Sequence, residues 1–316
     1  MLFCGRDMHY GYAFTREEGA RWSDTSSNGR VQVIQCDRDQ VDEVIGDAHV
    51  IVPLMCRLDR PRLEKAKRAR LIIQYGAGVE GVDAQAAADM GIALSNIPSR
   101  DTGNAESCAE MSIFLMLATL RQIRDMEESI RTRRLGVPCG RMLKGSTVCI
   151  VGNGNISKAL RPRLRGFGVS QCVLTRRVQC ELHDDSDVSD WSEVRSSCDG
   201  GALLRSKGWP LALTNFRLLT FQVTDDDGMS RILGKSDIVV FACAVNTESL
   251  GMMNEEFLRR CKAGVIIINV ARGGLLDYKA TKKGLECGTI GGMGLVSCAP
   301  CRGLHAHSHL QPSLGR

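Results

Sequence analysis

The segment Gly145-Ser-Thr-Val-Cys-Ile-Val-Gly-Asn-Gly-Asn-Ile-Ser157 predicts a buried β-strand that runs into a glycine turn and then into a helix. Its apolar residues Val148 to Val151 are β-branched or small, as in a strand covered on both faces. Gly152 allows a tight turn, and Gly154 would let a pyrophosphate approach bare backbone at a helix N-terminus. Ser157 replaces the third glycine of G-x-G-x-x-G and is still small enough for close packing. The candidate cofactor-binding residues of the turn are Gly152, Asn153, Gly154, Asn155 and Ile156.

The residues after this turn complete a strand–helix–strand unit. Residues 156–167 predict a helix ending at Gly168, and residues 172–175 predict the next strand. An NAD-binding domain usually carries a carboxylate for the ribose 2′-hydroxyl at the end of that strand. Two guanidiniums suit a 2′-phosphate better, so the sequence predicts NADP as the cofactor, with NAD as the alternative. The residues of this basic turn are Thr175, Arg176 and Arg177, and a solvated surface turn is the weaker alternative.

Composition limits the class of protein. The 316 residues are enough for two domains with separate cores. The 41 basic and 36 acidic residues are dispersed, so we predict no nucleic-acid partner and no membrane partner. No apolar run approaches the roughly 20 residues of a membrane span. Most of the 14 cysteines stand singly in apolar segments, which indicates reduced thiols in a cytoplasmic protein.

Residues 1–103 alternate short apolar strands with helical stretches and predict a small, flavodoxin-like α/β domain. The chain opens on an apolar strand pattern instead of a signal-peptide pattern. Residues 104–133 have the apolar spacing of one long helix that crosses to the next domain. In the first domain, strands are expected at 1–5, 31–34, 50–52 and 71–73, and helices at 41–45 and 58–69.

Residues 134–295 predict a Rossmann-type, doubly wound parallel sheet that binds the cofactor. Its later strands are expected at 238–241, 265–269 and 290–295. Residues 178–224 should hold one helix–strand unit but lack a clear period, so we interpret them as an irregular insertion. A non-coding segment retained in the transcript is one source of such an insertion. The tail, residues 296–316, has neither helix nor strand periodicity.

Four segments, in this order along the chain, resemble the D-isomer-specific 2-hydroxyacid dehydrogenases. Gln74-Tyr-Gly-Ala-Gly-Val-Glu-Gly-Val-Asp83 is similar to the substrate loop of that family, and Thr102-Gly-Asn-Ala-Glu-Ser-Cys-Ala-Glu110 to the opening of its interdomain helix. Val151-Gly-Asn-Gly-Asn-Ile156 matches its cofactor turn. Ile268-Asn-Val-Ala-Arg-Gly-Gly-Leu-Leu-Asp277 matches the segment with the catalytic arginine. The resemblance implies a homodimer that reduces a small 2-oxo acid, such as glyoxylate or hydroxypyruvate, with a nicotinamide cofactor.

The chemistry of this reaction suits the resembling residues. A 2-oxo acid must have its carboxylate bound and its carbonyl polarised before hydride and a proton are delivered. Backbone N–H groups of the glycine-rich loop can bind the carboxylate. By resemblance, Arg272 is the catalytic residue and offers two donors, while Val270 and Ala271 lie against the nicotinamide. The substrate-binding candidates are Ala77, Gly78, Val79, Glu80 and Gly81.

Several features keep two interpretations each. Glu80 is either a specificity residue or a carboxylate at the rim of its loop, and Asn246 either contacts the cofactor or forms a turn. Arg272 as a surface ion-pair partner is the weaker alternative for that residue. Cys298-Ala-Pro-Cys301 with three tail histidines offers zinc ligands, but the spacing matches no common finger, so we predict no metal site.

The resemblance breaks after Leu295. The catalytic glutamate and histidine of the family have no match there, and neither role transfers to His305, His307 or His309. Losing a general acid typically costs roughly 10²- to 10⁴-fold in rate. A catalytically impaired dinucleotide-binding module or partner subunit is therefore the second hypothesis. A defective product that does not fold stably is the third.

Overall fold

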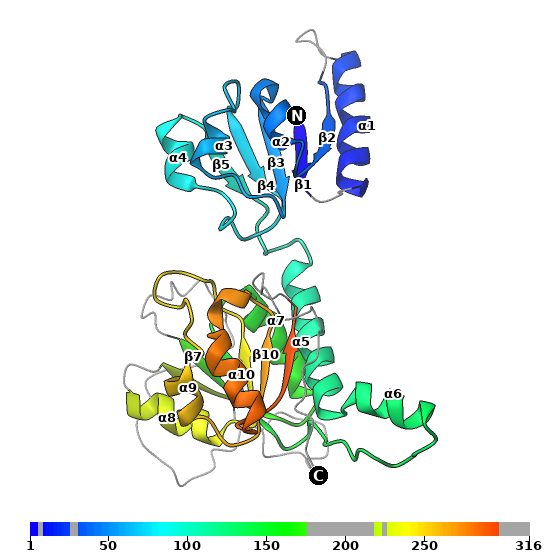
Figure 1. The fold of residues 1–316 in the computed structure, drawn as a ribbon, viewed down its shortest axis with the longest axis vertical. Coiled ribbons are helices and arrows are strands. Elements are labelled where there is room, and N and C mark those ends of the chain that lie inside the picture. The colour runs from blue at the N-terminus through cyan, green and yellow to red at the C-terminus, as the bar shows by residue number, and fades with distance from the viewer. Residues whose placement is uncertain (6–8, 26–30, 176–217, 223–225, 297–316) are drawn as a thin grey trace, which may run out of the picture. The chain divides into compact units, whose positions relative to one another are not determined.

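The computed structural model describes residues 1–5, 9–25, 31–175, 218–222 and 226–296. The chain divides into two compact units, Met1–Ala105 and Glu106–Arg316. Each unit is built on its own parallel β-sheet (Figure 1). No helix in the described ranges is long and apolar enough to cross a membrane.

The sheet of the first unit has five strands in the order β2-β1-β3-β4-β5. All of its neighbouring strands are parallel. This is the strand order of flavodoxin-like domains, so the predicted class of this unit is confirmed. The strands are β1 (Leu2–Gly5), β2 (Ile34–Asp37), β3 (Val50–Leu54), β4 (Leu71–Gln74) and β5 (Ala93–Asn96).

Helices cover both faces of this first sheet. One face carries α2 (Val41–Val44), α3 (Arg60–Leu63) and α4 (Ala84–Asp89), whose buried residues share one apolar cluster with the strands. The other face carries α1 (His9–Thr25), which meets the strands through Tyr12. Two of the short helices begin at aspartates whose side chains accept a backbone N–H, as N-caps do.

The sheet of the second unit has six parallel strands in the order β11-β10-β9-β6-β7-β8. Numbered within the unit, this is the 3-2-1-4-5-6 order of dinucleotide-binding domains, so the predicted Rossmann-type sheet is confirmed. The strands are β6 (Thr147–Val151), β7 (Ser170–Thr175), β8 (Leu218–Gln222), β9 (Ile238–Phe241), β10 (Val265–Asn269) and β11 (Ile290–Leu295).

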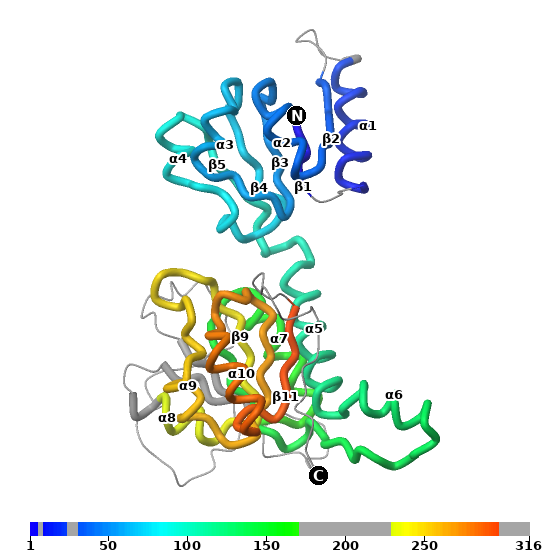
Figure 2. The backbone as a smooth tube through the Cα atoms, viewed as in Figure 1, coloured from blue at the N-terminus to red at the C-terminus, as the bar shows by residue number. Residues whose placement is uncertain are grey.

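Two apolar clusters hold the helices of the second unit on opposite faces of its sheet (Figure 2). The first face packs against α5 (Asn104–Leu120) and α7 (Asn155–Arg165). The second face packs against α8 (Asp226–Lys235), α9 (Glu255–Arg260) and α10 (Tyr278–Glu286). At Gly294 in β11, an added Cβ would lie 2.8 Å from the Cβ of Leu115, so this glycine lets α5 approach the sheet closely.

The prediction of one long helix over 104–133 is wrong. The structure has two helices, α5 and then α6 (Ile123–Arg131), because Gln122 adopts a left-handed conformation with φ of 51°. The N–H of Arg141 donates to the carbonyl of Leu120 at 2.9 Å, which satisfies a backbone group at the end of α5. This partner lies about twenty residues along the chain, so helical periodicity did not reveal it.

Two further predictions in the first unit need correction. The strand expected at 31–34 is instead β2 at Ile34–Asp37, where its pairing with β1 fixes the register. The helix expected over 58–69 is a single turn, α3, followed by turns up to Ala69. In the second unit, β8 lies inside the segment interpreted as an insertion, so residues 218–222 belong to the sheet. The rest of 178–224 and the tail after Val296 lie outside the described residues.

Candidate cofactor and substrate site

The glycine turn after β6 requires its first glycine. Gly152 has a φ of +110°, which L side chains rarely adopt. A Cβ at this position would lie 2.8 Å from the carbonyl oxygen of Ala242. The turn is therefore pressed against the end of β9, at the point where the strand order of the sheet reverses. Open α/β sheets bind their ligands at this kind of switch point.

The second glycine leaves open space where the first does not. A Cβ at Gly154 would meet no other atom within 4 Å, so nothing in the described protein needs a glycine there. Gly154 is the N-cap of α7 and Asn155 begins the helix, so the turn presents backbone N–H groups at a helix N-terminus. Ser157 is fully buried, in agreement with its predicted packing role. Space at Gly154 and donors in α7 fit the pyrophosphate of a dinucleotide.

Three neighbouring strands end at the same level beside this turn. Phe241 of β9 is in register with Val151 on one side and with Asn269 on the other. The residues that follow, Gly152 and Val270, therefore emerge at one edge of the sheet. The structure thus places the cofactor turn and the segment bearing Arg272 at the same edge of the sheet.

A buried asparagine shapes the segment that carries Arg272. Asn269 is fully buried, and its Nδ2 donates to the carbonyl oxygen of Arg272 at 2.8 Å. Its Oδ1 accepts the N–H of Ala271 at 3.0 Å. One side-chain amide therefore closes the loop over three residues and fixes its backbone. The sequence motifs give Asn269 no role, although an amide at the end of a buried apolar strand indicates that it has buried partners.

Arg272 is exposed, and one of its terminal nitrogens, Nη1, donates to the carbonyl oxygen of Ala271 at 3.1 Å. Burial raises the pKa of Cys108 in α5, and the nearby positive charge of Arg272 opposes that rise. Val270 and Ala271 are buried, and the N–H of Val270 donates to the carbonyl oxygen of Phe241 at 3.2 Å. The apolar base of this edge is thus buried, while Arg272 is exposed.

The predicted substrate loop lies in the first unit, between β4 and α4. The Nδ2 of Asn96 donates to the carbonyl oxygen of Ala77 at 2.6 Å. The N–H of Leu58 donates to the carbonyl oxygen of Gly81 at 2.8 Å. Within the described residues, no hydrogen bond engages the backbone N–H groups of Ala77, Gly78 or Val79. The loop is therefore held by its carbonyl groups and retains N–H donors for an anion.

The remaining sequence predictions have mixed outcomes. Glu80 is exposed, which leaves both of its interpretations open. The Oδ1 of Asn246 accepts the N–H groups of Glu248 and Ser249 at 3.0 and 2.8 Å, so Asn246 forms a turn. Thr175 ends β7, while Arg176, Arg177 and the cysteines and histidines of the tail lie outside the described residues. Among the described residues, no group of His, Cys, Asp and Glu side chains could hold a metal ion.

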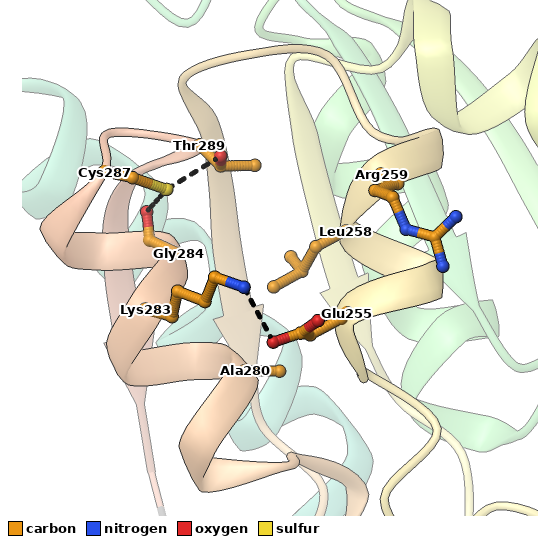
Figure 3. Close-up of a pocket in the computed structure, with 8 residues that line it drawn as sticks. All are labelled: Glu255, Leu258, Arg259, Ala280, Lys283, Gly284, Cys287 and Thr289. Carbon is orange, nitrogen blue, oxygen red and sulfur yellow. Dashed lines mark hydrogen bonds and ion pairs between the residues drawn. The ribbon is translucent and has the colours of Figure 1, made fainter.

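A small pocket between α9 and α10 is a separate feature of the second unit (Figure 3). Its volume is about 170 Å³, and Lys283 spans it to pair with Glu255 at 3.0 Å. Thr289, which lines the pocket, precedes β11, whereas the cofactor turn follows a strand. The pocket therefore lies at the amino ends of the strands, whereas the cofactor turn lies at their carboxyl ends. Its volume is smaller than the several hundred Å³ typical of ligand sites.

A six-stranded sheet in dinucleotide-binding order, with a glycine turn at its switch point and an arginine two strands away, defines the class of dinucleotide-binding α/β domains. A sequence model described as the NAD binding domain of the D-isomer specific 2-hydroxyacid dehydrogenases matches residues 113–200 and 217–298, more than half of the chain. The chain belongs to this family, whose members oxidise or reduce 2-hydroxyacids and 2-oxo acids with a nicotinamide cofactor.

Similar proteins agree with this assignment. A glyoxylate reductase of Pyrococcus furiosus is 27% identical over 270 residues, which are 82% of this chain and 68% of that protein. A D-3-phosphoglycerate dehydrogenase of Mycobacterium tuberculosis is 26% identical over 84% of this chain and 44% of its own length. The D-lactate dehydrogenase of Aquifex aeolicus, solved with NAD and lactic acid, has the same fold, with a TM-score of 0.72. It is 18% identical, and the match covers 95% of this chain and 78% of that one.

Proposed function

We propose that this protein reduces a small 2-oxo acid of the glyoxylate or hydroxypyruvate type, with NADPH as the hydride donor. The observation that carries the proposal is the edge of the second sheet, where the glycine turn and the Asn269-framed Arg272 emerge together. Similar proteins named glyoxylate reductase support the substrate class.

The residues of the cofactor turn would bind the dinucleotide through its pyrophosphate. Gly154 leaves the space that a pyrophosphate would fill, and the first N–H groups of α7 would donate to its oxygens. When bound, the nicotinamide supplies the hydride. Val270 and Ala271 exclude water from the apolar base of this edge, since both are buried in the cores of the unit.

Each unit carries a donor group that suits part of a 2-oxo acid. In the first unit, the N–H groups of Ala77, Gly78 and Val79 suit a carboxylate, because backbone amides bind anions without a counter-charge. Arg272 would donate to the carboxylate and carbonyl oxygens, and it would stabilise the charge that grows on the carbonyl oxygen as hydride arrives. Backbone amides accept any carboxylate, so they set the class of substrate and not its identity.

The preference for NADPH rests on the residues after β7. Thr175 ends this strand at the position that faces the ribose of a bound dinucleotide in such sheets. Arg176 and Arg177 follow directly, and guanidiniums form strong, bidentate bonds to phosphate. A 2′-phosphate, present in NADPH and absent from NADH, would then be the group that they bind.

Fluorescence titration with NADPH and NADH tests the cofactor site. We expect saturable binding, with Gly154→Ala weakening both nucleotides about tenfold, because the new methyl group would occupy the space for the pyrophosphate. The matched control is Gly166→Ala at the other end of α7, where a Cβ meets only an ordinary contact of 3.7 Å and binding should not change. Unchanged affinity in a folded Gly154→Ala protein would contradict the site.

The same titration tests the cofactor preference. Arg176→Ala combined with Arg177→Ala is expected to weaken NADPH about 10- to 100-fold, since each charged hydrogen bond contributes roughly 1.5–3 kcal/mol. The affinity for NADH serves as the internal control and should stay within about twofold of its starting value. Equal losses for both nucleotides would reject the 2′-phosphate assignment.

A dinucleotide-binding partner subunit without catalysis is the second candidate function. It is favoured by the sequence after Leu295, in which nothing matches the glutamate and histidine that the family resemblance implies. The two candidates share the cofactor site and differ in turnover. NADPH oxidation that depends on glyoxylate supports the reductase, whereas tight NADPH binding without oxidation supports the subunit.

A homodimer would cover an apolar surface of the second unit. α6 and the chain after it extend away from the sheet (Figure 1). Their exposed apolar side chains include Ile123, Met126, Ile130, Leu135 and Val137. Several exposed apolar side chains on one short segment are typical of a protein interface. We propose that a second copy of the chain packs here.

Analytical ultracentrifugation tests the dimer. The unaltered chain should sediment as a dimer at micromolar concentration, and Ile130→Glu should give a monomer, since it buries a charge in the interface. The control is Leu250→Glu, which changes a leucine that is 65% exposed, close to the 62% of Ile130, but lies outside α6. A monomer without any substitution would contradict the proposal.

A further inference from the structure

Three cysteines of the first unit lie together at the carboxyl edge of its sheet. Cys4 in β1 is the register partner of Cys36 in β2, and Cys56 follows β3 by two residues. Cys4 and Cys56 are both buried in the same apolar cluster of the unit. Gly5, the residue after Cys4, lets β1 approach Cys56 closely, because a Cβ at Gly5 would lie 2.8 Å from the Cβ of Cys56. All three are free thiols.

The cysteines stand at the topological switch point of this sheet. The strand order β2-β1-β3-β4-β5 reverses between β1 and β3, which are the strands that carry Cys4 and precede Cys56. Crevices at such points are where open α/β sheets receive small ligands. Cys56 is only 4% exposed, so a reactant that reaches it must be small.

Arg62 of α3 places a fixed positive charge against Cys56. Its Nη1 lies 3.7 Å from the Sγ of Cys56 and donates to the carbonyl oxygen of Arg57 at 2.9 Å. Its Nε and Nη2 donate to the two carboxylate oxygens of Asp42, at 2.8 and 3.3 Å. Asp42 and the carbonyl oxygen of Arg57 therefore fix the guanidinium beside Cys56, where its charge can stabilise a thiolate.

The charged and titratable groups around Cys56 favour one thiolate in the cluster. The pKa of Cys56 is lowered to about 7, first by the hydrogen bond from Cys4 and then by Arg62 and Arg38, against the opposing effect of burial. The pKa of Cys36 is raised to about 11, chiefly by burial. The pKa of Cys4 is raised well above its usual range because its proton is held by Cys56. Cys56 is thus the nucleophile, and Cys4 is a neutral thiol in the same cluster.

We propose that Cys56 is a site of reversible oxidation by hydroperoxides and that Cys4 is its resolving thiol. The Cys56 thiolate attacks the terminal oxygen of the hydroperoxide, the O–O bond breaks, and the alkoxide leaves as an alcohol after taking a proton. Cys4 then attacks the sulfenic sulfur, a disulfide forms, and its proton leaves with the hydroxyl group as water. Two thiols are oxidised by two electrons, and one hydroperoxide is reduced to an alcohol and water.

The backbone near Cys56 supports the predicted substrate loop. The N–H of Leu58 donates to the carbonyl oxygen of Gly81 at 2.8 Å, and the carbonyl oxygen of Leu58 accepts the N–H of Asp83 at 2.9 Å. The carbonyl oxygen of Cys56 lies 3.6 Å from the position of a Cβ at Gly81. A disulfide to β1 would therefore displace the segment on which this loop rests. The consequence for substrate binding rests on the proposed function, whereas the oxidation itself does not.

Peptide mapping of the purified full chain tests the oxidation directly. Trypsin separates the three cysteines into residues 1–6, 31–38 and 39–57. After treatment with hydrogen peroxide and capping of the remaining thiols, we expect peptide 1–6 linked to 39–57, and expect dithiothreitol to release it. Linkage of 31–38 instead, or oxidation of other cysteines before these two, would overturn the proposal.

Variants separate the roles of the two sulfurs. In Cys4→Ser, Cys56 should stop at the sulfenic acid, which dimedone traps on peptide 39–57. Cys287→Ser removes an exposed thiol outside the cluster and should leave the linkage unchanged. If Cys4→Ser does not fold, the peptide map of the unaltered chain still decides. A cysteine pair that stays reduced while the folded chain is oxidised elsewhere contradicts the assignment.

The pH dependence tests the part played by Arg62. The rate of disulfide formation should rise with pH through about 7, where Cys56 becomes a thiolate. Arg62→Lys should slow it about fivefold at pH 7, as a rise of one pKa unit would. Arg60→Lys on the same helix is the control, since Arg60 pairs with Asp89 at 2.5 Å and touches no cysteine. Equal rates in the two variants would remove Arg62 from the site.

Hydrogen exchange and binding measurements follow the effect on the loop. Oxidation should change the exchange of the backbone amides of residues 77–83 at least about twofold and leave NADPH affinity unchanged, because the cofactor turn is in the other unit. If the reductase is active, KM for glyoxylate should rise on oxidation. If the disulfide forms but the chain does not reduce glyoxylate, only the proposed function is rejected. If oxidation leaves the amide exchange of residues 77–83 unchanged, the coupling between the disulfide and the loop is rejected.

Discussion

Replacing Arg272 by alanine is expected to lower kcat/KM for glyoxylate roughly 10²- to 10³-fold, the usual effect of removing a donor to a developing oxyanion. Arg272 is exposed at the edge where the cofactor turn emerges, and its backbone is fixed by Asn269. In the proposed mechanism, the lost group would bond to substrate oxygens and not to the pyrophosphate. NADPH affinity should therefore stay within about twofold of its starting value.

Two further variants sharpen this test. Arg272→Lys keeps the charge but loses the planar pair of donors, so we expect most of the loss to remain. Arg259→Ala is the control, because Arg259 is an exposed arginine of the same unit at the opposite edge of the sheet. Steady-state rates of NADPH oxidation measure all three. Turnover that survives Arg272→Ala would remove this residue from the mechanism.

Replacing Asn269 by alanine is expected to destabilise the second unit by about 2–4 kcal/mol. The substitution leaves the N–H of Ala271 and the carbonyl of Arg272 without the buried side-chain amide that bonds both. Each unpaired buried group costs about 1–3 kcal/mol. Thermal unfolding followed by circular dichroism should show a Tm lower by about 4–15 °C for a unit of this size.

A matched asparagine provides the control for this effect. Asn254 also accepts a backbone N–H, that of Phe257 at 2.9 Å, but it does so as the exposed N-cap of α9. Asn254→Ala should cost only about 1 kcal/mol. Asn269→Asp keeps the acceptor but loses the donor, so its Tm should fall between those of the two alanine variants. Equal Tm values for the two alanine variants would contradict the role given to Asn269.

Much of the second unit could be predicted because its strands are buried on both faces. Residues 238–241, 265–269 and 290–295 were predicted as strands, and β9, β10 and β11 have these bounds. Their continuous apolar runs carry the signal within a few residues of sequence. The glycine turn could be predicted for the same reason, since its conformational requirement is local to Gly152.

The errors arise where a distant partner decides the conformation. One helix was predicted over 104–133, but the N–H of Arg141 ends α5 at Leu120. The strand predicted at 31–34 is shifted because β1 selects which residues pair. The role of Asn269 could not be predicted, because its two backbone partners come within reach of its side chain only once the loop has folded.

The sequence by itself determined the class of both sheets, the cofactor turn and the family, because these depend on residues close together in the chain. Tertiary structure alone decided that Cys4 and Cys56 lie in one buried cluster and that Arg62 lies beside Cys56. About fifty residues separate the two cysteines, and no local pattern indicates that they lie together. Parallel strands bring their carboxyl ends to one edge, so chemistry spread along the sequence meets there only in the folded chain.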